Sequence, residues 1–283
     1  MEQPTLCDIF GSYMAWKRDY RTWFISFMNG SEYMYLLEGD EKALLIDTGW
    51  GAGNLRPFVE KLTSKPVMVV NTHFHPDHAG GNGEWEEVWM HENWALDVPS
   101  MRDCPCDVNR LPFPDYRHQL LRDGQIIDLG NRRVEALCMT AHSNSSLMFI
   151  DHGQRLLFCG DEIEAAQVLM YAIAELPGQP YDLGARLRAH HAHCAALWQR
   201  RDEWDDLCPN HNGSPIAREY LTDFMELSEH IFAGDAKRED KLNHFYIETQ
   251  SPLAPELCRV RWKGASFFVK KAELEAVWGA RAL

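Results

Sequence analysis

Residues 72–78 read Thr-His-Phe-His-Pro-Asp-His, so four potential metal ligands fall within six positions. The apolar run at 66–71, immediately before them, predicts a buried strand. His73 and His75 are two positions apart, and on an extended chain such side chains project from the same face. Pro76 keeps His75 in the extended conformation, so both imidazoles can reach one ion.

The residues after this histidine pair complete the pattern. Pro76 can open a helix, so the chain turns and directs Asp77 and His78 toward a nearby point. A single histidine is usually an ordinary surface or core residue. The pattern His-x-His-x-Asp-His at the end of a strand is much more specific, and it predicts a metal site.

Three later segments end in further ligand types. A strand-like run at 134–140 leads to His142, an apolar run from 156 leads to Asp161, and a short run from 206 leads to His211. Taken singly, Asp161 fits a helix N-cap, and the two histidines fit ordinary loop positions. A pair of metal ions needs ligands from several strand ends, and these segments together supply them.

In this order, the motifs resemble those of the metallo-β-lactamase-fold hydrolase superfamily, and the resemblance covers nearly the whole chain. It implies an α/β fold, namely a four-layer αβ/βα sandwich with a dinuclear metal site at the edge between the two sheets. It also implies two groups of three ligands, one for each ion, and an aspartate that bridges them. These ligands are His73, His75 and His142; Asp77, His78 and His211; and the bridging Asp161.

Asp47 lies in the sequence Leu-Ile-Asp-Thr-Gly at 45–49 and resembles the strand-ending aspartate of the same superfamily. The resemblance implies that Asp47 contacts a ligand histidine from outside the metal site. Such a carboxylate accepts the spare N–H of the histidine and fixes its tautomer. The alternative is a carboxylate that caps the turn before Gly49.

The remaining periodicity agrees with this fold and with one domain over residues 1–283. A hairpin is expected around 39–42, and the other elements are helices over 55–62, 185–200 and 219–232, a strand over 258–271 and a last helix over 272–278. The helix over 185–200 carries His190, His191 and His193, which we expect on its solvated face.

Two proline-containing stretches, 97–119 and 162–184, do not fit the regular core, and we expect them to be lid insertions. A lid with Arg110 and Arg117 would grip an anionic substrate over the metals. The candidates for the pocket wall are Trp50, Phe74 and Tyr171. The alternative for the first stretch is a solvated surface excursion.

Composition narrows the class of partner. With 283 residues, 45% of them hydrophobic, the chain can bury a large core. A net charge of −14 argues against nucleic acid, whose binding requires basic surface, and favours a small-molecule substrate. There is no stretch as long and apolar as a membrane span and no signal-like N-terminus, so we expect a cytoplasmic protein without a membrane partner. The oligomeric state has no signature in the sequence.

The ligands predict a metal-dependent hydrolase. Two divalent ions, zinc or alternatively iron or manganese, would share a hydroxide that acts as the nucleophile. Asp77 would be the catalytic residue that orients this nucleophile and carries a proton.

The bridging Asp161 favours certain substrates. It resembles the hydroxyacylglutathione-hydrolase, lactonase and phosphodiesterase branches of the superfamily, whereas Glu164 stands where lactone-cleaving relatives have a tyrosine. We therefore expect cleavage of a small-molecule thioester, ester or lactone. The alternatives are a small-molecule phosphodiesterase, a mononuclear-iron dioxygenase of the same fold, and a catalytically silent binding protein.

Overall fold

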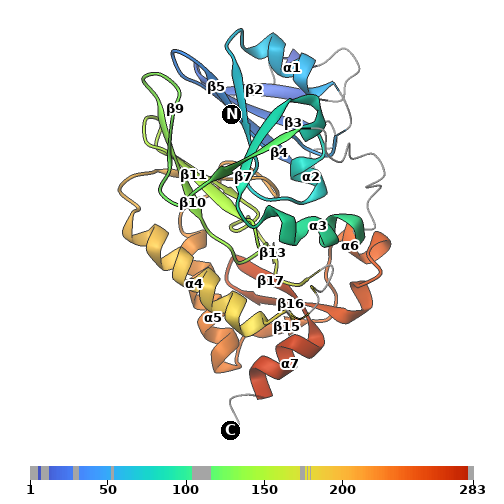
Figure 1. Ribbon diagram of the computed structural model, residues 1–283. Helices are drawn as coiled ribbons and strands as arrows, with labels where there is room; N and C mark the ends of the chain where they lie inside the picture. Colours follow the sequence, from blue (N-terminus) through green and yellow to red (C-terminus); the bar gives the residue numbers. More distant parts are fainter. Residues whose placement is uncertain are drawn as a thin grey trace.

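The structure is a computed structural model that describes residues 6–7, 13–27, 32–51, 54–103, 116–172, 176, 178 and 180–279. Within these residues, two large sheets pack face to face, and helices cover the outer face of each sheet (Figure 1). The predicted four-layer αβ/βα sandwich is therefore confirmed. A third, smaller sheet is built mainly from the C-terminal part of the chain.

The first sheet has eight described strands, arranged in chain order. The expected hairpin is present, and β5 is buried along its whole length because Leu45 faces one core and Leu44 the other. From β5 to β8 the strands pair in parallel, which suits strands that are apolar on both faces. The strands are β1 (Leu6–Cys7), β2 (Tyr13–Asp19), β3 (Thr22–Phe27), β4 (Tyr33–Glu38), β5 (Ala43–Ile46), β6 (Val67–Val70), β7 (Glu87–His91) and β8 (Arg117–Leu121).

The second sheet has five described strands in the order β14-β12-β11-β10-β9. Only the β12–β14 pair is parallel within this order. Its inner face meets that of the first sheet, where the rings of Tyr35 and Phe158 lie 4.7 Å apart. The strands are β9 (Ile126–Asp128), β10 (Arg133–Cys138), β11 (Leu147–Asp151), β12 (Leu156–Gly160) and β14 (Asp206–Pro209).

Short helices cover the outer face of the first sheet. α1 (Leu55–Leu62) has the predicted bounds, and its buried residues Leu55, Phe58 and Val59 follow the i, i+3, i+4 spacing of one helix face. The other elements on this side are α2 (Pro76–Ala79), the 3-10 helix η1 (Asn82–Glu84) and α3 (Trp94–Asp103).

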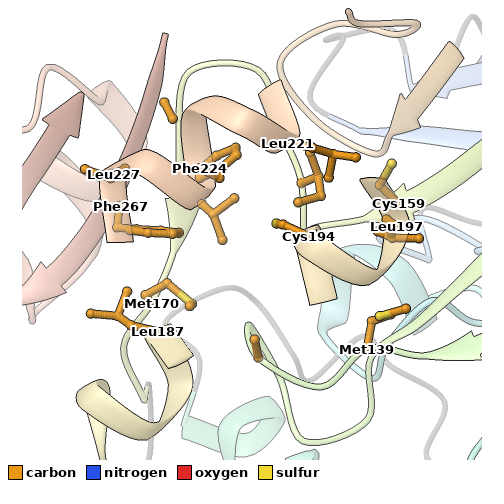
Figure 2. Packing of buried hydrophobic residues seen from close by; sticks show 14 of the residues in the cluster. Met139, Cys159, Met170, Leu187, Cys194, Leu197, Leu221, Phe224, Leu227 and Phe267 are labelled. Atoms are coloured by element: carbon orange, nitrogen blue, oxygen red, sulfur yellow. The ribbon is translucent and has the colours of Figure 1, made fainter. Parts of the chain in front are cut away.

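Two longer helices, α4 (Leu183–Gln199) and α5 (Tyr220–Ala233), share one buried cluster with residues of the second sheet. Figure 2 shows Leu187 and Leu197 of α4 and Phe224 of α5 gathered in one buried cluster. Gly234, in the left-handed region at φ 77°, ends α5 where the sequence predicts its end. Among the helices described, none has both the length and the apolar character that a membrane span requires.

The third sheet, in the order β13-β17-β16-β15, corrects one prediction. Residues 258–271 form two strands instead of one, because the chain reverses at Lys263 and Gly264, where Lys263 has a positive φ of 48°. The elements here are β13 (Val168–Leu169), β15 (Lys237–Glu239), β16 (Leu257–Trp262), β17 (Ala265–Lys270), α6 (Phe245–Gln250), α7 (Lys271–Gly279) and the 3-10 helix η3 (Ala254–Glu256).

Two further predictions were wrong. Residues 97–119 are not irregular at their two ends: 97–103 continue α3 despite Pro99, and 117–119 belong to β8, while 104–115 lie outside the described residues. His190 is not on a solvated face. It is buried, and its Nε2 atom bonds to the carbonyl of Glu162 (2.6 Å), so this face of α4 packs on the core.

Candidate metal centre

The predicted ligands follow the ends of strands at the edge where the two large sheets meet. Backbone hydrogen bonds join the sheets there, from Leu147 N to Thr72 O (2.6 Å) and from Tyr33 N to Asn210 O (2.7 Å). Gly160 permits the close approach, because a Cβ atom at this residue, with φ 55°, would lie 2.8 Å from the Cβ of Thr72. His73 and His75 follow β6, Asp77 and His78 lie on α2, and His142, Asp161 and His211 follow β10, β12 and β14.

The structure brings the first three histidines together. One ring nitrogen from each of His73, His75 and His142 lies within 4.8 Å of the others, and His142 Nε2 is 3.2 Å from His75 Nδ1. We call these three residues the first ligand group. They are buried or nearly so, and ring nitrogens at such spacing can converge on a single cation.

Asp77, His78 and His211 form a second ligand group. The Nε2 atom of His211 lies 3.2 Å from Asp77 Oδ2 and 3.3 Å from His78 Nε2. Asp77 Oδ2 is also 3.7 Å from His78 Nε2. One carboxylate and two imidazoles thus present their ligand atoms to a common point.

Asp161 lies between the two groups. Its Oδ2 atom is 3.3 Å from His78 Nε2 and 3.5 Å from His211 Nε2, and it is 3.8 Å from Nε2 of both His73 and His142. A single oxygen therefore approaches ring nitrogens of both groups. An ion held by either group would thus lie close to this oxygen.

The buried polar atoms fit a metal pair. Nε2 of His73 and Oδ1 of Asp161 are buried and have no hydrogen-bond partner among the described residues. Unpaired buried polar atoms are rare in folded proteins and need a specific explanation. Histidine nitrogens and carboxylate oxygens are ligands that zinc, iron and manganese accept. Bound cations would satisfy both atoms.

Asp47 contacts the second ligand group from outside. Its Oδ2 atom lies 2.9 Å from Nδ1 of His78, and the carboxylate also accepts hydrogen bonds from Thr72 N, Thr72 Oγ1 and Asn210 Nδ2, each at 2.7 Å. The side chain of Asp47 thus bonds His78 and the neighbours of His73 and His211, and these contacts differ from the alternative in which it caps the turn before Gly49. A proton on Nδ1 of His78 leaves Nε2 free for a metal.

A similar contact orients His142. Its Nδ1 atom donates to the carbonyl of Leu169 (2.8 Å) in β13, which leaves Nε2 directed toward the first ligand group. Oε1 of Glu162 accepts the backbone N–H groups of Ala141 (2.9 Å) and His142 (2.8 Å). Burial raises the pKa of Glu162 to about 7. The loop that carries His142 is thus held from two sides.

The surroundings of the first ligand group favour neutral imidazoles. Burial lowers the pKa of His73 well below its usual value, lowers that of His75, and lowers that of His142 to about 4. Neutral imidazoles are the form that binds metal ions.

The second group carries charge. Burial alone would lower the pKa of His211, but Asp161 and Asp77 outweigh it and raise that pKa to about 10. The pKa of His78 is raised well above its usual value in the same way, against burial. The pKa of Asp77 falls to about 2, because His78 and His211 outweigh the effect of burial. Without ions, protons on two histidines compensate the carboxylates, and cations would replace those protons.

The sequence interpretation missed one carboxyl group near the centre, Glu32, and assigned no ligand role to another, Glu164. Glu32 is buried and hydrogen-bonded by Trp50; burial and then the charge of Asp77 raise its pKa to about 8. Glu164 accepts a hydrogen bond from Asn212 (2.6 Å), and burial followed by Asp161 raises its pKa. Glu164 had a signal in its position three after Asp161. Glu32 had none, because only the fold brings it near the site.

The predicted substrate contacts have different outcomes. Phe74 is buried in the core against Trp94, because a residue between two histidines on an extended chain points to the opposite side. Tyr171 is also mostly buried, in a small cluster with Phe268. The side chain of Arg117 is 70% exposed and pairs with Glu87 on the neighbouring strand β7. As substrate contacts these three residues remain predictions, Arg110 lies outside the described residues, and Trp50 is half-buried beside Glu32.

Comparison with known proteins gives consistent matches. The model of the family described as "Metallo-beta-lactamase superfamily" matches residues 29–204. The chain is 29% identical to "Acyl-coenzyme A thioesterase MBLAC2" of Homo sapiens over 162 residues, which cover 46% of this chain and 57% of the relative. It is 27% identical to "Hydroxyacylglutathione hydrolase" of Dechloromonas aromatica (strain RCB) over 137 residues, 47% of this chain and 44% of the relative. The chain thus spans about half the length of these relatives.

A solved structure agrees with the fold. "Metallo-beta-lactamase from Pontibacter korlensis" superimposes with a TM-score of 0.58 at 19% identity, and the match covers 77% of this chain and 99% of that one. At this identity, the likeness concerns the arrangement of the chain alone.

Proposed function

Because this chain belongs to the metallo-beta-lactamase superfamily, we propose that it is a metal-dependent hydrolase that cleaves a small-molecule thioester. The observation that carries the proposal is the position of Asp161, whose Oδ2 atom lies 3.3 to 3.8 Å from ring nitrogens of both ligand groups. Relatives named as an acyl-coenzyme A thioesterase and a hydroxyacylglutathione hydrolase, both of which act on thioesters, support the choice of bond.

The donor set fits two divalent ions, and we propose zinc, held by the first and second ligand groups with Asp161 between them. Such a pair would lower the pKa of a shared water molecule toward neutrality and polarise the carbonyl oxygen of the substrate. Asp77 keeps a low pKa and therefore stays ionised, and its side chain is 20% exposed, so its carboxylate can accept a hydrogen bond from that water and orient it. Asp47 and Leu169 keep His78 and His142 in the required tautomers.

Glu164 supports a thioester over a lactone as the substrate. Its position, three residues after Asp161, is where lactone-cleaving relatives have a tyrosine whose hydroxyl group is absent here. The Glu164 carboxyl group is buried and bound by Asn212 instead. A thiolate leaving group also needs less protonation than an alkoxide, because thiols are more acidic than alcohols.

A substrate panel on protein of measured metal content tests the proposal. It compares acyl-coenzyme A and hydroxyacylglutathione thioesters with oxygen esters, lactones and an aryl phosphodiester. We expect kcat/KM to be highest for a thioester, to vanish with a chelator and to return with zinc. Hydrolysis of the phosphodiester alone, or oxygen uptake by an iron-loaded protein without hydrolysis, would refute the thioesterase assignment.

A further inference from the structure

A buried carboxylate that the metal ligands do not include lies on α3. Asp97 is 2% exposed, and it contacts the loop that follows His142. Its Oδ1 atom accepts the backbone N–H of Asn144 (3.2 Å) and the side-chain amide of the same residue (2.9 Å). Its Oδ2 atom accepts the hydroxyl group of Ser145. Two consecutive loop residues are thus fixed by one side chain.

The same contacts reach the segment that carries His73 and His75. The Oγ atom of Ser145, which donates to Asp97, accepts the backbone N–H of Phe74 at 3.2 Å. Phe74 lies between the two histidines, so this hydrogen bond restrains the segment that carries both rings. Both chain segments that supply the first ligand group therefore converge on Asp97.

The two ligand groups are contacted by different carboxylates. The second ligand group has its own carboxylate, Asp47, which bonds His78 directly. Among the described residues, Asp97 accepts hydrogen bonds from Asn144 and Ser145, which come two and three residues after His142 of the first ligand group.

We propose that Asp97 is a positioning residue for the first ligand group, acting through Ser145 and the 141–146 loop on His73, His75 and His142. The inference rests on the two-metal centre proposed above. It predicts a division of roles in which Asp97 determines affinity for one ion and Asp47 determines affinity for the other. A carboxylate that merely stabilised the fold would have no such selectivity.

The test measures zinc affinity in two backgrounds, each keeping one ligand group. His211→Ala removes a ligand of the second group, so the remaining ion is held by the first. His142→Ala does the reverse. Adding Asp97→Ala should raise the zinc dissociation constant about 10 to 100-fold in the His211→Ala background, as loss of the partner of a metal ligand does. In the His142→Ala background the change should stay within about 3-fold, because Asp97 does not contact the second group.

Two companion variants keep the result interpretable if Asp97→Ala folds poorly. Asp97→Asn retains one acceptor oxygen and should restore part of the affinity. Ser145→Ala leaves Asp97 in place, breaks the link to Phe74 and should weaken only the first site. Equal losses in the two backgrounds, or no loss in either, would overturn the proposal. A background that binds no zinc would overturn the assignment of two groups and the proposal with it, whereas the substrate panel would still decide whether thioesters are cleaved.

Discussion

Replacing Asp47 with asparagine is a sharp test of the contacts around the second ligand group. The carboxylate accepts a hydrogen bond from Thr72 N at Oδ1 and three hydrogen bonds at Oδ2. Asparagine has one acceptor oxygen and one NH2 donor, so either orientation of its amide points the NH2 group at another donor. The φ of 65° at this position is one that asparagine tolerates, whereas alanine would add backbone strain.

We expect the affinity for one of the two ions to fall about 10 to 100-fold, the usual effect of removing the partner of a ligand histidine. This corresponds to about 1.4 to 2.7 kcal/mol of binding free energy. The cause is the loss of the charged acceptor 2.9 Å from Nδ1 of His78, which holds a proton on that nitrogen so that Nε2 is the atom that binds the metal. Each buried donor left without an acceptor also costs about 1 to 3 kcal/mol of folding stability.

The assay separates these two effects. Zinc is titrated against a chromophoric chelator in the His142→Ala background, with and without Asp47→Asn, and thermal unfolding is recorded for both proteins. A lower Tm with an unchanged zinc dissociation constant would refute the reasoning, because Asp47 would then stabilise the fold without orienting His78. Asp151→Asn is the matched control: it should lower the Tm and leave the zinc affinity alone.

Three further predictions concern the bridge, the protons and the core. Asp161→Ala should retain one ion per chain instead of two, because the second group loses the oxygen that it shares with the first; metal analysis after dialysis counts the ions, and two retained ions would contradict the bridging role. Metal binding near pH 7 should release protons, because His78 and His211, whose pKa values are raised (to about 10 for His211), are protonated there and must become neutral ligands. Affinity should therefore increase as the pH rises toward 10, and calorimetry in two buffers of different ionisation enthalpy counts the protons. Asp151→Asn should lower the free energy of unfolding by about 3 to 5 kcal/mol, because it leaves Arg132 charged and buried, and chemical denaturation would measure the loss.

The sequence predicted the parts of this molecule that depend on local pattern. The run before His73 is apolar enough to read as a strand, and α1 has bounds that follow from its apolar spacing. The ligand positions could be anticipated because each follows a strand, and the carboxyl ends of strands gather at one edge of such a fold. In α1 and β6, the elements predicted from the apolar spacing are the ones that the fold contains.

Contacts between distant segments could not be predicted in this way. Asp97 is 47 residues from Asn144, and its stretch looked irregular because Pro99 interrupts the helical pattern. Glu32 precedes β4 and Asp77 follows β6, so they come together only through the pairing of strands within the first sheet. The burial of His190 depends on how α4 packs, and its sequence neighbours His191 and His193 are more exposed. In each case, the informative neighbour lies far along the chain.

The carbonyl of Leu169 that orients His142 belongs to β13, and β13 is paired with β17 of the third sheet. The proposed metal centre and its supports therefore extend past the region that the family model matches, residues 29–204, because both β17 and the proposed ligand His211 lie beyond it. A recombination event that exchanged everything after residue 204 would replace His211 itself. It would also replace β17, the strand that pairs with β13 and so helps to place the Leu169 carbonyl that bonds His142. Exchange of C-terminal parts among such proteins would have to preserve both features at once, so this segment should evolve together with the site instead of as an independent appendage.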